Sequence, residues 1–257
     1  LDKTPVAFSV SSENAEEENS LTIVKVEKQN TAQKGKISVH KTGDIFTSVT
    51  TASSAYKNEN GEMIVNPTTY TPVFADGDLS GTVFQVIAVE DIVTLDGTVR
   101  ANAGNVVAEI TTDENGYAET EPLYLGKYEV REIKAPYGYV LNNEPKDVEL
   151  TYAGQEFEVR DTVNTAFENE YQGVRISLSK VMENDELFGI YGKDYYTSVR
   201  FGLFASENIT AADGTVIPAD GLLSEVSLDE NMTAKFDVQI PFGRYYVQEI
   251  ATDEHYI

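Results

Sequence analysis

The stretch Leu125-Gly-Lys-Tyr-Glu-Val-Arg-Glu-Ile133 returns later in the chain as Phe242-Gly-Arg-Tyr-Tyr-Val-Gln-Glu-Ile250. In the first copy Tyr128, Val130 and Glu132 fall on every second residue, and a period of two is typical of a strand with one buried face. The sequence therefore predicts a repeated β domain in which a glutamate shares the inward face with apolar side chains.

Other segments repeat around this one, and turn signals separate them. The pairs are GKISVHKTG from Gly35 with GVRISLSKV from Gly173, Thr82–Ala88 with Val199–Ala205, and Asp96–Val99 with Asp213–Val216. Dipeptides typical of tight turns are Asn60-Gly61, Asp76-Gly77, Asp96-Gly97, Asn115-Gly116 and Asp213-Gly214. No stretch of about ten residues or more has the 3.6-residue apolar period of a helix. We expect an all-β fold of tandem antiparallel, immunoglobulin-like sandwiches.

The repeats predict one complete domain over residues 34–172. Residues 173–257 form an incomplete copy that lacks its last strands, and it also lacks about 22 residues that the first copy has within Asp44–Asp78. Residues 1–33 correspond to the closing strands of a preceding or partner-completed domain, because Leu1-Asp-Lys-Thr-Pro5 is similar to Leu141-Asn-Asn-Glu-Pro145.

Composition excludes several classes of function. The chain has 257 residues, 43 acidic and 19 basic, and a net charge of −24, which opposes binding to nucleic acid. Cysteine is absent and only His40 and His255 could supply imidazole, so thiol and most histidine chemistry is excluded and we expect no metal site and no cofactor. No apolar run is long enough to insert into a membrane.

Three polar residues share inward faces with apolar ones. Alternation places Lys41 with Ile37 and Val39, Glu132 with Tyr128 and Val130, and Asn169 with Phe167 and Tyr171. A buried ammonium group needs a partner. Two hypotheses follow: a simple buried ion pair beside an asparagine, or a reaction in which the neutral amine attacks the asparagine carbonyl while the carboxyl group carries protons.

A family resemblance favours the reaction. Tyr128-Glu-Val-Arg-Glu-Ile-Lys-Ala-Pro-Tyr-Gly-Tyr139 resembles the E-box of collagen-adhesin B-type (Cna B-type, prealbumin-like) domains, found in Gram-positive surface adhesins and pilins. The resemblance implies a Lys41–Asn169 isopeptide bond, with Glu132 as the catalytic carboxyl group.

The second copy retains Lys180 and the catalytic Glu249 but has no matching asparagine. Asn30 lies 11 residues before Lys41, as Asn169 lies 11 before Lys180, although Lys28 replaces the residue that matches Phe167. A Lys180–Asn30 bond would then need strand exchange between chains. The short link from Asn30 to Lys41 ties residues 1–33 to the start of the complete domain, whereas residues 173–257 begin at its end. An arbitrary cut through a longer stalk is the other explanation.

The expected function is that of a structural stalk or shaft segment of a bacterial cell-surface adhesin or pilus, outside the cell and attached to the cell wall. It is not an enzyme, beyond single-turnover bond formation within the chain. Neighbouring copies of the same domain are its expected partners. The alternative is an adhesin module that binds a host protein or glycan, possibly through the 44–80 insert, whose Ser, Thr, Tyr and Asn residues predict a surface loop.

Overall fold

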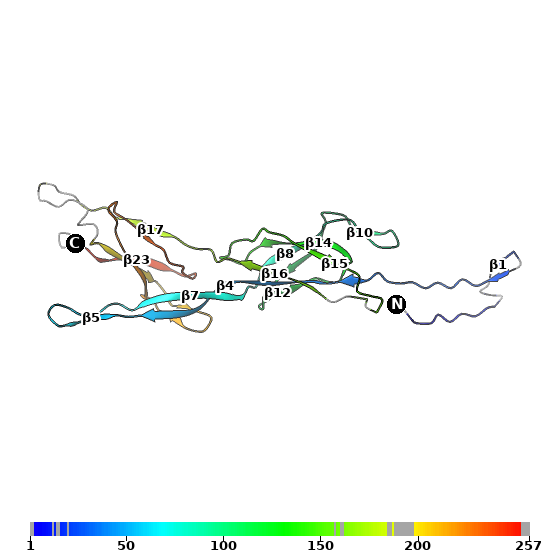
Figure 1. Cartoon of the computed structure of the whole chain (residues 1–257), viewed down its shortest axis with the longest axis horizontal. Helices are drawn as coiled ribbons and strands as arrows, with labels where there is room; N and C mark the ends of the chain where they lie inside the picture. The colour runs from blue at the N-terminus through cyan, green and yellow to red at the C-terminus, as the bar shows by residue number, and fades with distance from the viewer. Residues whose placement is uncertain are drawn as a thin grey trace. The chain divides into compact units, whose positions relative to one another are not determined.

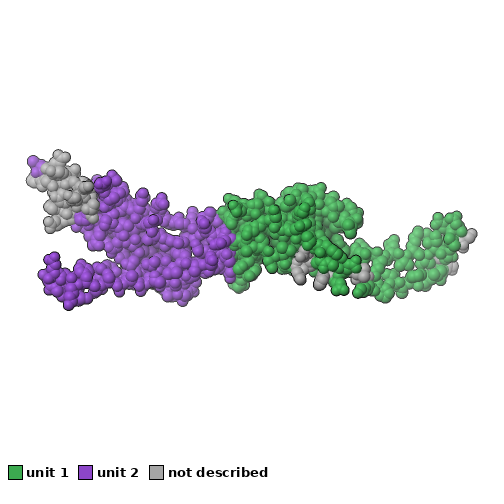
Figure 2. All heavy atoms as spheres, in the orientation of Figure 1, with its two compact units in different colours: residues 1–41, 79–135, 141–167 green, residues 42–78, 136–140, 168–257 purple. Residues whose placement is uncertain are grey.

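The computed structural model describes residues 3–11, 13, 16–19, 21–156, 158–159, 162–183, 187 and 198–252. Every regular element in this part of the chain is a strand, which confirms the all-β prediction (Figure 1). The chain divides into two compact units (Figure 2): residues 1–41, 79–135 and 141–167 form unit 1, and residues 42–78, 136–140 and 168–257 form unit 2. The boundaries 1–33, 34–172 and 173–257 stay a prediction.

Unit 1 is a sandwich of two layers. One layer is the antiparallel sheet β11-β8-β14-β15, and the other joins β12 and β16 to β4. The strands are β1 (Glu16–Glu18), β2 (Leu21–Ile23), β3 (Lys34–Gly35), β4 (Ile37–Ala52), β8 (Val83–Ala88), β9 (Ile92–Val93), β10 (Val99–Ala101), β11 (Val106–Thr111), β12 (Tyr117–Glu119), β13 (Leu123–Tyr124), β14 (Gly126–Lys134), β15 (Lys146–Leu150) and β16 (Val163–Asn169). β4 continues beyond Lys41 into unit 2, and the last two residues of β16, Glu168 and Asn169, are also assigned to unit 2.

The core of unit 1 follows from the alternation in its strands. Tyr128 and Val130 on β14 are buried while their neighbours Lys127 and Arg131 point outward. Inward side chains of both layers meet in one apolar cluster that includes Ile37, Val39, Phe84, Val86, Tyr128, Val130, Val148, Leu150 and Phe167. The strand predictions around Lys41, Glu132 and Asn169 are therefore confirmed.

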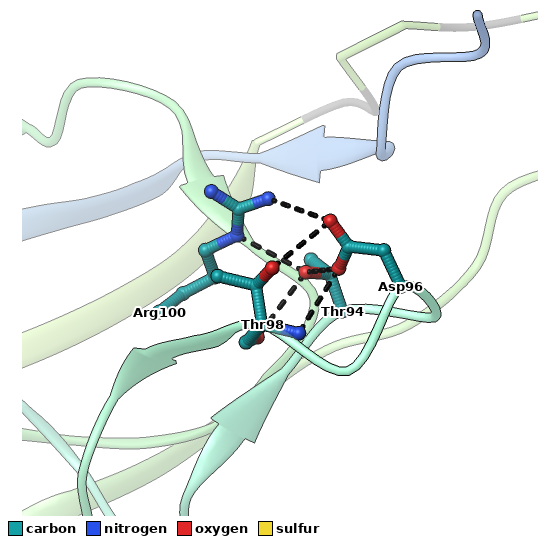
Figure 3. Close-up of polar contacts among 4 residues, drawn as sticks. All are labelled: Thr94, Asp96, Thr98 and Arg100. Atoms are coloured by element: carbon teal, nitrogen blue, oxygen red, sulfur yellow. Dashed lines mark hydrogen bonds and ion pairs between the residues drawn. The ribbon is translucent and has the colours of Figure 1, made fainter.

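The turn predicted at Asp96-Gly97 joins β9 to β10, and its aspartate organises the turn (Figure 3). The Asp96 carboxylate accepts hydrogen bonds from the Thr94 hydroxyl at 2.5 Å and from the Thr98 amide at 3.1 Å, and it forms an ion pair with Arg100 at 3.4 Å. Because these contacts favour its charged form, the pKa of Asp96 falls to about 2. In unit 2, Asp213 accepts two bonds from Thr215, as expected for the repeated turn.

Unit 2 contains a second, smaller sandwich. Its sheet carries β21, β18 and β23 side by side, with β17 paired to β22 as a separate ladder. The strands are β5 (Ala55–Lys57), β6 (Met63–Val65), β7 (Thr69–Asp78), β17 (Ile176–Ser179), β18 (Arg200–Ala205), β19 (Ile209–Thr210), β20 (Val216–Ile217), β21 (Leu222–Ser227), β22 (Thr233–Phe236) and β23 (Tyr245–Ala251). Leu203, Ala205, Ile217, Leu223 and Phe236 lie in its core.

The sequence predicts a surface loop for the insert. Residues 50–68 are exposed apart from Asn58, as expected, but the insert is built of strands and the prediction of a loop is wrong. Residues 42–52 of β4 pair antiparallel with β7, and the hairpin joins the sheet of unit 2 through a parallel bridge between Thr69 and Leu222. The predicted turn at Asp76-Gly77 is also wrong, because both residues lie within β7. Gly77 packs against the side chain of Ile45, where an added Cβ would lie 2.4 Å from the nearest carbon. Close packing, not a turn, requires glycine there.

Candidate functional site: two lysine–glutamate pairs

The first candidate site is an ion pair in the core of unit 1. Nζ of Lys41 on β4 lies 3.1 Å from Oε2 of Glu132 on β14, and both side chains are 0% exposed. The two strands belong to opposite layers, so the pair spans the inside of the sandwich. The structure therefore brings together two of the three residues that the sequence placed on inward faces.

The surroundings of this pair are apolar. The Phe167 ring lies 5.9 Å from the Lys41 ammonium group and packs against Phe84 at a centroid distance of 4.8 Å. Ile37 and Val39 precede Lys41 on the same strand and are fully buried. Removing two charges from water costs several kcal/mol per ion, so a fully buried pair contributes little to stability by itself. Such an expensive arrangement suggests chemistry instead of simple packing.

Asn169 occupies the last position of β16 and is buried. It follows Phe167 by two residues, so both side chains lie on the same face of the strand. β16 pairs with β4, the strand that carries Lys41. The Val163 amide donates to the Lys36 carbonyl at 2.9 Å, and the Ser38 hydroxyl donates to the Asn164 side-chain oxygen at 2.5 Å.

The second candidate site repeats the pair in unit 2, but in a more open environment. Nζ of Lys180, just after β17, donates to Oε2 of Glu249 on β23 at 2.6 Å. The two side chains are 31% and 29% exposed. Ile176 and Leu178 on β17 are half-buried, whereas the matching Ile37 and Val39 are fully buried. This copy thus has the pair without the closed core around it.

Asn30 lies outside any strand and is exposed. It belongs to residues 24–33, which connect β2 to β3 and form no ladder of their own. His255 lies outside the described residues.

Sequence reasoning missed a tyrosine contact that repeats in both units. The Tyr128 hydroxyl donates to the Tyr124 carbonyl at 2.5 Å, and the Tyr245 hydroxyl donates to the Pro241 carbonyl at 2.7 Å. Burial raises the pKa of Tyr128 to about 12. The identical spacing of four residues in both copies was the available signal. These contacts fix the start of the strands that carry Glu132 and Glu249.

The part of the chain that the structure describes holds neither a metal centre nor a membrane-spanning helix. It contains no group of three or more His, Cys, Asp or Glu side chains that could hold a metal ion. It also contains no helix long and apolar enough to cross a membrane.

A groove of about 430 Å³ lies within unit 2, between the insert hairpin and the sheet. Its lining includes Ser54, Asn66, Arg200, Phe204 and Glu225. Arg200 forms an ion pair with Glu225 at 3.2 Å. The lining mixes polar and apolar side chains, and the groove is a feature of the insert that could contact a ligand.

We compared the chain with known protein families to test the predicted resemblance. Residues 74–165 match the family model described as SpaA, prealbumin-like fold domain. This stretch is therefore similar to SpaA-type prealbumin-like domains. The SpaA match covers most of unit 1 and includes Glu132, and it confirms the predicted resemblance to prealbumin-like domains of Gram-positive surface proteins.

A curated relative and two solved structures are also similar to this chain. The trypsin-resistant surface T6 protein of Streptococcus pyogenes serotype M6 is 32% identical over 80 residues, which are 31% of this chain and 14% of the relative. The chain thus spans only a small part of that relative. The Bacillus anthracis TIE protein (18% identity, TM-score 0.45) aligns over 81% of this chain and 36% of its own. A streptococcal ancillary pilin (18% identity, TM-score 0.33) aligns over 91% of this chain and 59% of the pilin chain.

Proposed function

We propose that this chain is a structural segment of a Gram-positive cell-surface stalk or pilus, and that Lys41 and Asn169 in it become joined by an isopeptide bond. The observation that carries the proposal is the fully buried Lys41–Glu132 pair at 3.1 Å, whose Glu132 lies in the stretch that matches the prealbumin-like family model. The proposed location is the cell surface, in line with the word "surface" in the name of the streptococcal relative. The proposed role is structural, and no substrate is turned over.

The placement of Asn169 is inferred from the pairing of β16 with β4. Contacts from Val163 to Lys36 and from Asn164 to Ser38 advance in the same direction along both strands. Continuing this count, Phe167 reaches the level of Lys41, and its ring lies 5.9 Å from the lysine nitrogen. Asn169 then takes the next position along the same face of β16.

The proposed reaction is balanced within the chain. The uncharged Lys41 amine attacks the Asn169 side-chain carbonyl, a new C–N bond forms, and the bond to the amide nitrogen breaks, so that ammonia leaves. Glu132 takes the proton from the attacking amine and gives one to the departing nitrogen. No cofactor or metal ion is needed.

The test is an intact mass measured under denaturing conditions. The chain is expected to weigh about 17 Da less than its sequence requires, because one ammonia is lost for each amide bond formed. Lys41→Ala, Glu132→Gln and Asn169→Ala should each restore the full mass. Asn164→Ala, on the same strand, is the matched control and should retain the loss. A full-mass wild-type chain would reduce the site to a buried ion pair.

A ligand-binding adhesin module is the second candidate, favoured by the groove beside the insert. It predicts that a host protein or glycan binds the chain and that Arg200→Ala or Phe204→Ala weakens this binding. Binding that is indifferent to both substitutions would remove the groove from consideration.

A further inference from the structure

Thr82 is a buried polar residue that the packing of unit 1 does not explain. It lies directly before β8 and is 0% exposed. Among the described residues, its Oγ1 atom has no hydrogen-bond partner. Buried hydroxyl groups are nearly always hydrogen-bonded, because one without a partner costs stability. Valine would fill the same space without that cost, so the hydroxyl group at this position calls for another explanation.

The backbone of Thr82 is held on both sides. Its amide donates to the Thr112 hydroxyl at 3.0 Å, and its carbonyl accepts from the Thr112 amide at 3.0 Å. The Thr112 hydroxyl donates in turn to the Leu79 carbonyl at 2.8 Å, and the Leu79 amide donates to the Lys41 carbonyl at 3.0 Å. Residues 79–82 are therefore tied to the position on β4 that carries the lysine of the first candidate site.

The side chain of Thr82 lies on the inward face of its sheet, near Glu132. Thr82 and Phe84 are buried while Val83 between them is half-buried, as alternation requires for two inward residues. Phe84 lies opposite Glu132 in the pairing of β8 with β14. Thr82 is then the diagonal neighbour of Glu132, at a distance of about 7–8 Å that a long side chain can span. The register shifts just beyond Glu132, and such bulges are frequent beside active sites.

The strand directions decide at which end of the core Thr82 lies. Gly35 pairs with Leu123, and further along the two segments Lys41 meets Glu132, so β4 and β14 advance in the same direction. β8 is antiparallel to β14, so the beginning of β8 lies beside the end of β14. Thr82 is therefore at the end of the core that holds the Lys41–Glu132 pair.

Two aromatic residues relate this end of the core to the proposed reaction. Phe84 packs against Phe167 across the core, with 4.8 Å between their ring centroids. Thr82 precedes Phe84 by two residues, and Asn169 follows Phe167 by two. Because β16 advances with β4 and β8 runs the opposite way, both steps lead in the same direction. The place that the Asn169 side chain takes in the proposed reaction thus borders Thr82.

We propose that the Thr82 hydroxyl group donates a hydrogen bond to the side-chain oxygen of Asn169 while Lys41 attacks the carbonyl carbon. Thr82 would then be a further catalytic residue, and this inference rests on the proposed function. As the C–N bond forms, the second electron pair of the C=O bond moves to the oxygen, which becomes negative. The carbonyl forms again when ammonia leaves, and the hydroxyl group keeps its proton throughout.

A donor that is in place before the reaction stabilises this charge where no water can do so. Because it is aimed at the oxygen of the tetrahedral state, such a donor has no ideal partner beforehand. The buried Oγ1 of Thr82 fits this description within the part of the chain that the structure describes.

Thr82→Val tests the hydroxyl group with little change of shape. The whole chain is made by cell-free synthesis with a pulse of isotopically heavy leucine and is quenched in denaturant at successive times. Intact mass then gives the fraction of pulsed chains that is lighter by about 17 Da. Thr82→Val should lose ammonia at least about tenfold more slowly than the wild type, as expected for loss of one such donor. Thr82→Ser retains a hydroxyl group and should restore a rate close to that of the wild type.

Thr120→Val is the matched control. Thr120 is also a buried threonine of unit 1, but its hydroxyl group accepts a hydrogen bond from the Ile37 amide at 3.1 Å. Its substitution should lower the free energy of unfolding of unit 1 and leave the rate of ammonia loss by folded chains unchanged.

Thr82→Val should have the opposite effects. Its stability is compared in a Glu132→Gln background, where no bond forms, by native-state hydrogen exchange of the β8 and β14 amides. The added Thr82→Val substitution should leave the free energy of unfolding equal or higher, because a buried hydroxyl group without a partner is removed.

The pH profile separates a hydrogen bond to the reacting oxygen from an effect through Glu132. Pulsed chains are transferred to buffers of different pH before the reaction is followed. Thr82→Val should lower the rate by the same factor at every pH, because the hydroxyl group does not titrate in this range. A profile displaced along the pH axis would mean that Thr82 acts through the protonation of Glu132, and it would overturn the inference.

Three further results would overturn it. The first is a Thr82→Val chain that loses ammonia as fast as the wild type, and the second is a Thr82→Ser chain as slow as Thr82→Val. The third is a Thr82→Val substitution that destabilises the Glu132→Gln chain, because a slow reaction would then reflect poor folding. In each case the wild type still loses ammonia, so the proposed Lys41–Asn169 bond stands without Thr82. A wild-type chain of full mass would overturn both proposals.

Discussion

Lys41 and Lys180 each face a glutamate, yet water reaches only the second pair. Around Lys41, the Phe167 ring and the fully buried Ile37 and Val39 close the core, so the pair has no solvent to screen it. Around Lys180, side-chain exposure of about one-third leaves the attraction screened, and exposed pairs typically contribute about 0–1 kcal/mol. The two lysine–glutamate pairs thus have different environments, because neighbouring strands bury the first pair and leave the second partly exposed.

At the same scale, Asp96 predicts a pH dependence. Its pKa is about 2 in the folded chain, against 3.8 for the ordinary carboxyl group, chiefly because Thr94 and Thr98 donate to it. A lowered pKa means that its stabilising contribution is complete above pH 3.8 and is lost as pH falls towards about 2. Carboxyl NMR titration should give a midpoint near that value. The free energy of unfolding of Asp96→Asn should differ from that of the wild type above pH 3.8, and this difference should vanish as the pH falls to about 2.

Asp213 is the internal comparison for this titration, because Thr215 also lowers its pKa. An Asp96 midpoint at the ordinary value would contradict the hydrogen-bonded turn of Figure 3.

At the scale of elements, the sequence predicted strands with one buried face and turns held by their own residues. It missed strands whose position depends on pairing with a distant part of the chain. The strand carrying Glu132 and the turn at Asp96-Gly97 follow from residue order alone, because one face is buried and the turn residues bond to each other. The strands of the insert do not follow from residue order. Its Ser, Thr and Asn content is typical of a loop, whereas β7 forms a strand because it pairs with β4. Asp76-Gly77 failed as a turn for the same reason.

The inward position of Asn169 was predicted from strand alternation, and its burial agrees with that. The openness of the Lys180 site could not be predicted from residue types, because it depends on which strands lie beside β17 and β23. The aromatic contacts of unit 2 also had no local signal, since they join residues far apart in the chain. Examples are Phe74 with Tyr171, at 5.0 Å between ring centroids, and Tyr171 with Phe242, at 5.3 Å.

The loop 136–140 gives a prediction for this aromatic cluster. Gly138 has a φ of +88°, and an added Cβ would lie 2.0 Å from the Phe242 ring. Gly138→Ala should therefore destabilise unit 2 by backbone strain of about 1 kcal/mol plus overpacking of about 1–3 kcal/mol. Gly154→Ala is the matched control, because Gly154 has a φ of +102° with no atom within 4 Å of an added Cβ.

Hydrogen exchange of the β18 and β23 amides would measure this loss. Gly154→Ala should destabilise unit 1, and only by the cost of backbone strain. Equal effects of the two substitutions on their own units would contradict the close approach of Phe242.

At the scale of the whole molecule, the proposed Lys41–Asn169 bond would close a loop of 128 residues. A crosslink over so long a loop lowers the conformational entropy of the unfolded chain, by roughly 5 kcal/mol if it is treated as a disulfide of the same span. The chain has no cysteine, so this stabilisation would not depend on the redox state of its surroundings.

Asn169→Ala should accordingly destabilise unit 1 by up to about 5 kcal/mol, beyond the loss of one hydrogen bond. Native-state hydrogen exchange of the β8 and β14 amides would report the free energy of unfolding, with intact mass confirming that the bond is absent. Asn164→Ala on the same strand should cost only about 1 kcal/mol, as expected for one hydrogen bond. Equal losses in the two variants would contradict a covalent link.

β4 is one continuous strand of 16 residues whose first part belongs to unit 1 and whose remainder pairs with β7 in unit 2. A slip of one residue along it would turn Lys41 from Glu132 towards solvent, since successive side chains point to opposite faces. The proposed bond can then form only in molecules whose β4 has found its native alignment. The missing ammonia would serve as a permanent mark of correct folding, so that one mass spectrum counts the molecules in a preparation that folded properly at least once.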